Sequence, residues 1–318
     1  MSSLCCGKDL VDSEDGSSDA SSIAFSDAAT STGSFDPNGN DSRSIELDDE
    51  ETRRTRLDAK MLQQEFPGLT YEECVRFRTI RTIKRARKKL KSYLQWRETY
   101  RMDDIPLQSL TFKNDEEVWD YAVSHSLSCY PEVKLDKKLP RIVRLIGKDP
   151  YKKMTDDPGD DDVTDSKSGK RILYILSGLV DSKIAPMDVY SLSLAVYFYL
   201  KLDRSGLEDI MAVTDARNGK GWANLSAASL LPFAKQVAKH LDFFPQRLDK
   251  FHAYPVPLAA KILWGVLKTF LKPVVVAKVN IHWGSSAIDA DPPESMSAEH
   301  FDGTTMERLQ RERISEFC

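Results

Sequence analysis

Residues 258–271 read LAAKILWGVLKTFL, and this apolar stretch decides how the rest of the chain is interpreted. A helix of this length would be roughly 21 Å long, too short to cross a hydrocarbon core of about 30 Å. Apolar side chains would occupy nearly every face, so one side must meet a sheet and another side must meet some other apolar surface. Two interpretations stay open: a fully buried core helix, or a helix that lines an apolar ligand cavity and moves at Pro255, Pro257 and Pro273.

Short β-rich runs and longer helical segments alternate around this stretch. Helices are expected from Pro186 to Leu200 and from Ser226 to Leu241. Strands are expected near residues 141–146, 171–176, 209–214, 250–254 and 274–281. Five strands that alternate with helices predict one α/β domain built on a single sheet.

The composition limits the classes of function. The chain has 318 residues, of which 41% are hydrophobic and 30% charged, with a net charge of −4. A chain of this length can bury a substantial core. Its net charge gives no overall attraction to nucleic acid, so we expect no nucleic-acid partner. Five cysteines, two of them adjacent, argue against a disulfide framework, and we expect a cytoplasmic protein.

The first 55 residues differ from the rest of the chain. They are rich in serine and acidic residues and poor in large apolar side chains, so we expect residues 1–55 to form a disordered acidic tail. The tail shows no secretory signal pattern. Cys5 and Cys6 are either ordinary thiols or sites of reversible acylation, and the sequence does not decide between them.

A strongly basic segment follows from Arg76 to Arg101, with Glu98 as its one acidic residue. Thr70 and Glu73 form a capping box that would begin a helix there. Apolar residues at positions 80, 83, 86, 90, 93 and 100 would form one stripe, which leaves most basic side chains facing outward. The basic face is a solvated surface, a nucleic-acid stripe or a surface attracted to anionic lipid, and its candidate membrane-facing residues are Lys84, Arg85, Lys88 and Lys89.

Several motifs around the apolar stretch carry a resemblance to a known family. Residues 244–248 (FPQRL), the stretch itself, residues 270–273 (FLKP) and residues 278–279 (KV) resemble, in order and spacing, the Tyr-Pro-Glu-Arg-Leu, gate-helix, Pro-Phe-Leu and Ser-Lys-Ile series of CRAL-TRIO domains. Residues 168–174, 213–215, 93–97 and 298–304 are similar to further segments of that family. The resemblance covers about residues 66–305.

The resemblance implies a fold, a division of the chain and a function. It implies an α/β CRAL-TRIO fold with a mostly parallel five-stranded sheet, flanking helices and an apolar lipid cavity. The expected parts are a helical lobe at residues 56–110, the lipid-binding domain at residues 111–305 and a C-terminal tail at residues 306–318. The implied function is to bind one lipid or other lipophile, such as a phospholipid, and to transfer or present it at membranes in the manner of phosphatidylinositol transfer proteins. The residues expected to contact the lipid are Arg247, Phe251, Tyr254, Leu263, Trp264, Leu267, Phe270, Val275 and Lys278.

Two departures from the family pattern bear on the ligand. Phosphatidylinositol-binding members have a Glu and a Thr where this chain has Gln246 and Val275, whereas Arg247 and Lys278 are retained. Two cations remain for a phosphate, but the hydrogen bonds that would select inositol are weakened. Arg247 is equally interpretable as a structural ion-pair residue. The identity of the lipid therefore stays open.

An enzyme is the less favoured class. Residues 218–221 lack the leading Gly and the trailing hydroxyl of a phosphate-binding loop, and Cys74 lacks an Arg six positions later. The five histidines, at positions 125, 240, 252, 282 and 300, show no zinc spacing, so no metal and no cofactor other than the lipid are expected. We expect a monomeric binding protein that contacts membranes transiently. The alternative is a scaffold that uses the same fold for protein or membrane contacts.

Overall fold

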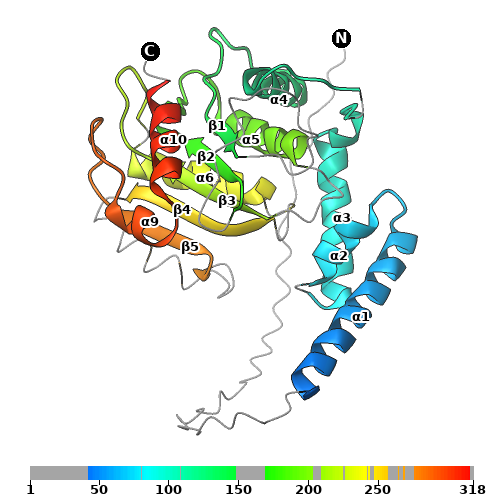
Figure 1. Ribbon diagram of the computed structural model, residues 1–318. Coiled ribbons are helices and arrows are strands. Elements are labelled where there is room, and N and C mark those ends of the chain that lie inside the picture. The colour runs from blue at the N-terminus through cyan, green and yellow to red at the C-terminus, as the bar shows by residue number, and fades with distance from the viewer. Residues whose placement is uncertain are drawn as a thin grey trace, which may run out of the picture. The chain divides into compact units, whose positions relative to one another are not determined.

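The centre of the fold is a five-stranded sheet whose strands follow the order of the chain. In this computed structural model the sheet order is β1-β2-β3-β4-β5, and every neighbouring pair except the antiparallel β1–β2 pair is parallel (Figure 1). The strands are β1 (Val143–Ile146), β2 (Ile172–Leu176), β3 (Ile210–Asp215), β4 (Leu248–Val256) and β5 (Val279–Trp283). The predicted five-stranded, mostly parallel sheet is confirmed, with β5 beginning later than expected, after a turn at Ala277 and Lys278.

The structure describes most of the chain, with gaps. The described residues are 42–79, 81–107, 109–147, 169–202, 209–224, 226–241, 243, 247–256, 264, 268 and 276–315. The thiols at Cys5 and Cys6 therefore lie outside the described residues.

Two predicted helices connect the parallel strands. α5 (Met187–Lys201) follows Pro186 and links β2 to β3, and α6 (Ala227–Leu241) links β3 to β4 with Pro232 inside it. Residues 189–199 of α5 are all buried because the helix packs against α6 and against α4 (Asp115–Cys129). The hydroxyl of Tyr197 on α5 also accepts a hydrogen bond from Leu145 N of β1 at 2.9 Å. The sheet order follows the chain order, so right-handed crossovers place α5 and α6 on the same face.

The basic segment forms two helices, whereas the sequence predicted one. The capping box is confirmed: Thr70 N donates to Glu73 Oε2 at 2.8 Å, and Glu73 N donates to Thr70 Oγ1 at 3.1 Å. The helix that it begins, α2 (Tyr71–Thr79), ends after nine residues, and α3 (Ile83–Thr99) starts after Thr82, which has extended backbone angles. The junction is rich in β-branched residues, which fit extended backbone better than a helix.

Both ends of the chain contain helices where tails were expected. α1 (Ser42–Glu65) includes residues 42–55, so the expected tail boundary falls inside a helix, and residues 1–41 lie outside the described part. At the other end, α9 (Glu294–Glu299) and α10 (Gly303–Ile314) follow β5. The expected C-terminal tail from residue 306 is therefore wrong, because α10 buries Leu309 and Arg313.

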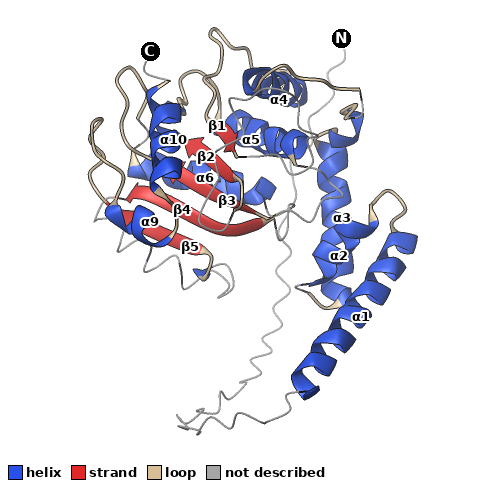
Figure 2. Cartoon of the chain, viewed as in Figure 1, coloured by secondary structure: helices blue, strands red, loops and turns tan. Residues whose placement is uncertain are grey.

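The core is continuous from the N-terminal helices to the sheet. Every residue of β2 and β3 is buried, so both faces of these strands are covered, and helices lie on either side of the sheet (Figure 2). Tyr93 on α3 and Phe77 on α2 belong to the same apolar cluster as α5 and the strands. The N-terminal helices thus pack onto the α/β domain and share its core.

Candidate functional site

The segment expected to form the gate connects β4 to β5. Within it the structure describes Trp264 and Lys268, both helical, with Trp264 half-buried and Lys268 exposed. Four of the expected lipid contacts lie outside the described residues: Leu263, Leu267, Phe270 and Val275.

The two aromatic residues expected on β4 point to opposite faces of the sheet. Side chains alternate along a strand, and Phe251 and Tyr254 are three residues apart in a regular stretch that pairs with Ala212 through Asp215 of β3. Phe251 is half-buried against the core, whereas Tyr254 is fully buried and its hydroxyl donates to Asp215 Oδ2 at 3.2 Å. These two side chains therefore cannot line one cavity on one face of β4.

The retained cations Arg247 and Lys278 lie at the amino ends of β4 and β5. Lys278 Nζ donates to the carbonyl oxygen of Leu248, the residue after Arg247, at 2.6 Å. Arg247 is buried, and both cations lie within electrostatic reach of Asp209. Nearby, Lys170 forms an ion pair with Asp249 at 2.8 Å. The structure thus brings the two predicted phosphate contacts to the same edge of the sheet.

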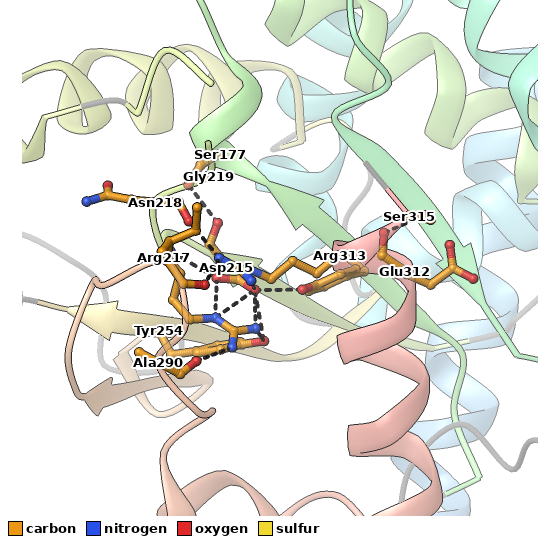
Figure 3. Close-up of polar contacts among 12 residues, drawn as sticks. Ser177, Asp215, Arg217, Asn218, Gly219, Tyr254, Ala290, Glu312, Arg313 and Ser315 are labelled. Atoms are coloured by element: carbon orange, nitrogen blue, oxygen red, sulfur yellow. Dashed lines mark hydrogen bonds and ion pairs between the residues drawn. The ribbon is translucent and has the colours of Figure 1, made fainter. Parts of the chain in front are cut away.

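The carboxyl end of β3 carries a buried network of charged and polar groups (Figure 3). Asp215 Oδ2 accepts hydrogen bonds from Arg217 Nη2 at 2.7 Å and from the hydroxyl of Tyr174 on β2 at 2.7 Å. Arg313 of α10 lies 3.6 Å from the same oxygen and donates to the carbonyl of Asn218 at 2.6 Å. All four side chains of this network, Tyr174, Asp215, Arg217 and Arg313, are buried.

This network joins α10 to the sheet. Arg217 Nη1 also donates to the carbonyl of Ala290, in the loop before α9, at 2.6 Å. Burial raises the pKa of the Tyr174 hydroxyl well above its usual range, and the neighbouring Asp215 adds to the effect, so the hydroxyl stays a donor. Sequence analysis missed this network because its members are distant in sequence. The Asp215-x-Arg217 pair was the one local signal of it.

The basic face of α3 is exposed, and the opposite face packs against α6. Lys84, Arg85 and Lys88 are exposed. Lys89 is half-buried, and its ammonium lies 4.3 Å from the centroid of the Phe243 ring, so it differs from the other three expected members of the patch. On the packed side, Ala86, Leu90 and Tyr93 are buried as predicted, and Trp96 Nε1 donates to Nδ1 of His240 on α6 at 3.0 Å.

Three histidines that are scattered in the sequence meet in the structure. His252 on β4, His282 on β5 and His300 after α9 place one ring nitrogen each within 4.8 Å of the others. His252 Nδ1 and His282 Nε2 are 3.0 Å apart. Burial lowers the pKa of His252 to about 3, helped by the two neighbouring rings, so this imidazole is neutral at pH 7. Spacing along the sequence does not indicate this cluster, because strand pairing brings together residues that are 30 positions apart.

Comparison with known proteins identifies the domain. Residues 164–303 match the family model of the CRAL/TRIO domain. This chain contains a CRAL-TRIO domain. The matched residues run from before β2 to the first residue of α10, and so include the four parallel strands and the expected gate segment.

Other comparisons add little to this CRAL-TRIO assignment. No curated protein sequence matches the chain. Among solved structures, the chain is similar to the crystal structure of Sfh5, with 13% identity over 73% of this chain and 72% of that chain and a TM-score of 0.40. CRAL-TRIO domains bind lipids and other lipophiles, so the domain gives the chain a lipid-binding function at the level of the family. Among the described residues, no helix combines the length and the apolar character needed to span a bilayer.

Proposed function

We propose that this chain holds a single lipid, or a similar lipophile, in an apolar cavity between the sheet and residues 258–271, and releases it at membranes. The observation that carries the proposal is the CRAL/TRIO match over residues 164–303. Lipid chains in water expose apolar surface at a free-energy cost of about 25 cal/mol per Å². A carrier therefore needs a cavity that excludes water and an apolar segment that covers its opening. The composition of residues 258–271 suits such a covering segment, because ten of the fourteen residues are apolar.

We further propose that the ligand is a phospholipid whose phosphate lies near Lys278. The ammonium of Lys278 donates to the neutral carbonyl of Leu248, a hydrogen bond that does not neutralise its positive charge, and Asp209 lies within electrostatic reach of it. Arg247, one residue before that carbonyl, adds a second cation at the same edge of the sheet. A phosphate attracts such a pair of cations strongly, and the retention of both residues supports this ligand class.

The exposed face of α3 supports contact with an anionic membrane. Lys84, Arg85 and Lys88 are exposed, while Trp96 holds the opposite face of the helix against α6. Basic side chains near an anionic surface contribute about 1 kcal/mol each, and this attraction weakens as salt is added. We therefore assign Lys84, Arg85 and Lys88 to a membrane-contact surface, and we leave Lys89 out because its ammonium lies on the Phe243 ring.

Lipid extraction from the purified protein tests the proposal directly. We expect one equivalent of lipid in the organic extract, identified by mass spectrometry, and exchange of a fluorescent phospholipid between vesicles. Trp264→Gln should slow this exchange several-fold with little change in the unfolding midpoint, because Trp264 is only half-buried. Lys268→Gln, an exposed position of the same segment, is the matched control and should exchange lipid at the native rate.

Two results would contradict a lipid carrier. The first is native protein that co-purifies with no lipid and extracts none from vesicles, which would favour the scaffold alternative. The second is Trp264→Gln protein that unfolds at a much lower midpoint but exchanges lipid normally per folded molecule. In that case residues 258–271 would form an ordinary core helix.

A further inference from the structure

The three-histidine cluster lies where β4, β5 and the end of α9 meet. His252 pairs with Asn280 in the β4–β5 register, so His282, two residues further along β5, points to the same face of the sheet as His252. The two rings are stacked at 14° with their centroids 5.3 Å apart. The ring of His300 stands edge-on to His252 at 4.5 Å, which brings three elements of the fold to one point.

One side of the cluster is buried, whereas the side of His300 is partly exposed to solvent. His252 is fully buried, His282 is 5% exposed, and Phe301 packs edge-on against the His252 ring at 5.1 Å. His300 is half-buried, so an ion would reach the three nitrogens from its side. Burial, with the Phe301 ring packed against His252, keeps water away from the His252 and His282 rings. The low dielectric there strengthens any bond that these rings form to a cation.

One ring is already oriented as a metal ligand would be. His282 Nδ1 lies 2.8 Å from the hydroxyl oxygen of Ser295 on α9, which leaves Nε2 facing His252 and the site. Ligating histidines in metal sites commonly make such a bond through the second nitrogen. His252 Nε2 is buried and has no hydrogen-bond partner among the described residues. The described residues therefore satisfy only part of the hydrogen-bonding capacity of the His252 ring.

We propose that His252, His282 and His300 bind a divalent transition-metal ion of the zinc class. Imidazole nitrogens suit Zn²⁺, Cu²⁺ and Ni²⁺, whereas Mg²⁺ and Ca²⁺ require oxygen ligands. In a tetrahedral zinc site with Zn–N bonds of about 2.0 Å, ligand nitrogens lie about 3.3 Å apart. The 3.0 Å between His252 Nδ1 and His282 Nε2 is close to that value, and small ring movements bring His300 into place.

Binding needs no net loss of a proton from the two facing rings. Without the ion, one of the two facing nitrogens carries the hydrogen that the other accepts. With the ion, both facing nitrogens present lone pairs, and the hydrogens sit on His252 Nε2 and on His282 Nδ1, which then donates to Ser295. Three imidazoles leave the fourth position of a tetrahedral ion to water. The ion would join β4, β5 and α9 and so stabilise the folded chain. This proposal does not depend on lipid binding.

Metal titration of the 318-residue chain, freed of ions by chelation, tests the site. We expect one equivalent of Zn²⁺ to bind by calorimetry and to raise the unfolding midpoint by several degrees. Co²⁺ in its place should give the visible spectrum of a nitrogen-ligated tetrahedral ion. His300→Ala, at the half-buried ligand, should lower the affinity at least tenfold, and Ser295→Ala should weaken binding tenfold or more while all three ligands remain.

His125→Gln is the matched control, because it removes a histidine outside the cluster whose Nε2 lies 2.8 Å from the Tyr100 carbonyl. It should bind Zn²⁺ as the native chain does. The cysteines are present in every variant, so any ion that they hold contributes equally throughout. Native protein that binds no ion at micromolar concentration would overturn the proposal. Equal binding by His300→Ala, or a thiolate-to-cobalt band in the native spectrum, would also overturn it.

Discussion

Replacing Asp215 by Asn tests whether the network at the carboxyl end of β3 depends on charge. Asn has nearly the shape of Asp, so the substitution removes the negative charge and little volume. The carboxylate is 1% exposed and faces the guanidinium of Arg217, whose side chain is fully buried, at 2.7 Å. Removing one partner of a buried ion pair costs about 3–5 kcal/mol, because the other charge stays buried without compensation.

The surroundings of Asp215 indicate that the cost of this substitution lies at the upper end of that range. Asp215 faces a second buried guanidinium, that of Arg313, and it accepts the hydroxyl hydrogen of Tyr174. The amide of Asn would present hydrogens of its own to this set of donors. We therefore expect a loss of about 4–5 kcal/mol, a large part of the 5–15 kcal/mol that usually separates folded from unfolded chains.

Urea unfolding followed by circular dichroism measures this loss. Ser177→Ala is the matched control, since the Ser177 hydroxyl donates to the backbone carbonyl of Asp215 at 3.0 Å and carries no charge. It should cost about 1 kcal/mol. Because Arg313 belongs to α10, Asp215→Asn should also speed amide hydrogen exchange in residues 306–315, and Ser177→Ala should not. Equal losses for the two variants would refute the view that charge compensation holds this network together.

Three further outcomes are expected. Charge reversal at Lys84, Arg85 and Lys88 should weaken binding to vesicles that contain phosphatidylserine by about tenfold or more at low salt, whereas reversal of the exposed Lys134, Lys137 and Lys183 should have a smaller effect; binding that is equal at low and high salt would rule out this surface. Lys278→Ala should lower the affinity for phosphate-bearing lipids about tenfold and leave uncharged lipophiles unaffected, as measured by competition with a fluorescent lipid. Burial, assisted by Lys239, lowers the pKa of His240 to about 4, so the unfolded chain takes up a proton there before the folded chain does. Stability should therefore fall by about 2 kcal/mol more in the native chain than in His240→Asn between pH 7.5 and pH 5, and equal falls would contradict the assignment.

Local patterns in the sequence predicted the elements of this fold well. The strands and connecting helices follow from short β-rich runs and from Pro186, and the capping box of Thr70 and Glu73 occurs as expected. The break between α2 and α3 was missed because the apolar spacing continues through it. α10 was not predicted because its sequence is polar. One of the side chains that it buries is that of Arg313, and arginine is a residue type that is rarely buried.

Contacts between distant residues were beyond the reach of these patterns. Spacing along the chain detects a zinc finger, but it cannot detect histidines that come together through the register of β4 and β5. The same holds for Asp215 and Arg313, which are 98 positions apart. A family resemblance, which carries three-dimensional information, grouped Arg247 and Lys278 as expected lipid contacts. The structure places both residues at one edge of the sheet, and their contact with a lipid stays a prediction.

The alternation of side chains along β4 separates the two sites proposed for this chain. Phe251 points to one face of the sheet, whereas His252 points to the other, which is the face of Asp215 and Arg313. A lipid on one face and a metal ion on the other would thus be held by neighbouring residues without touching. Phe251→Ala should weaken lipid binding and leave Zn²⁺ affinity unchanged, and His300→Ala should do the reverse. Loss of both activities in either variant would mean that the two sites share one face, contrary to the register of β3 and β4.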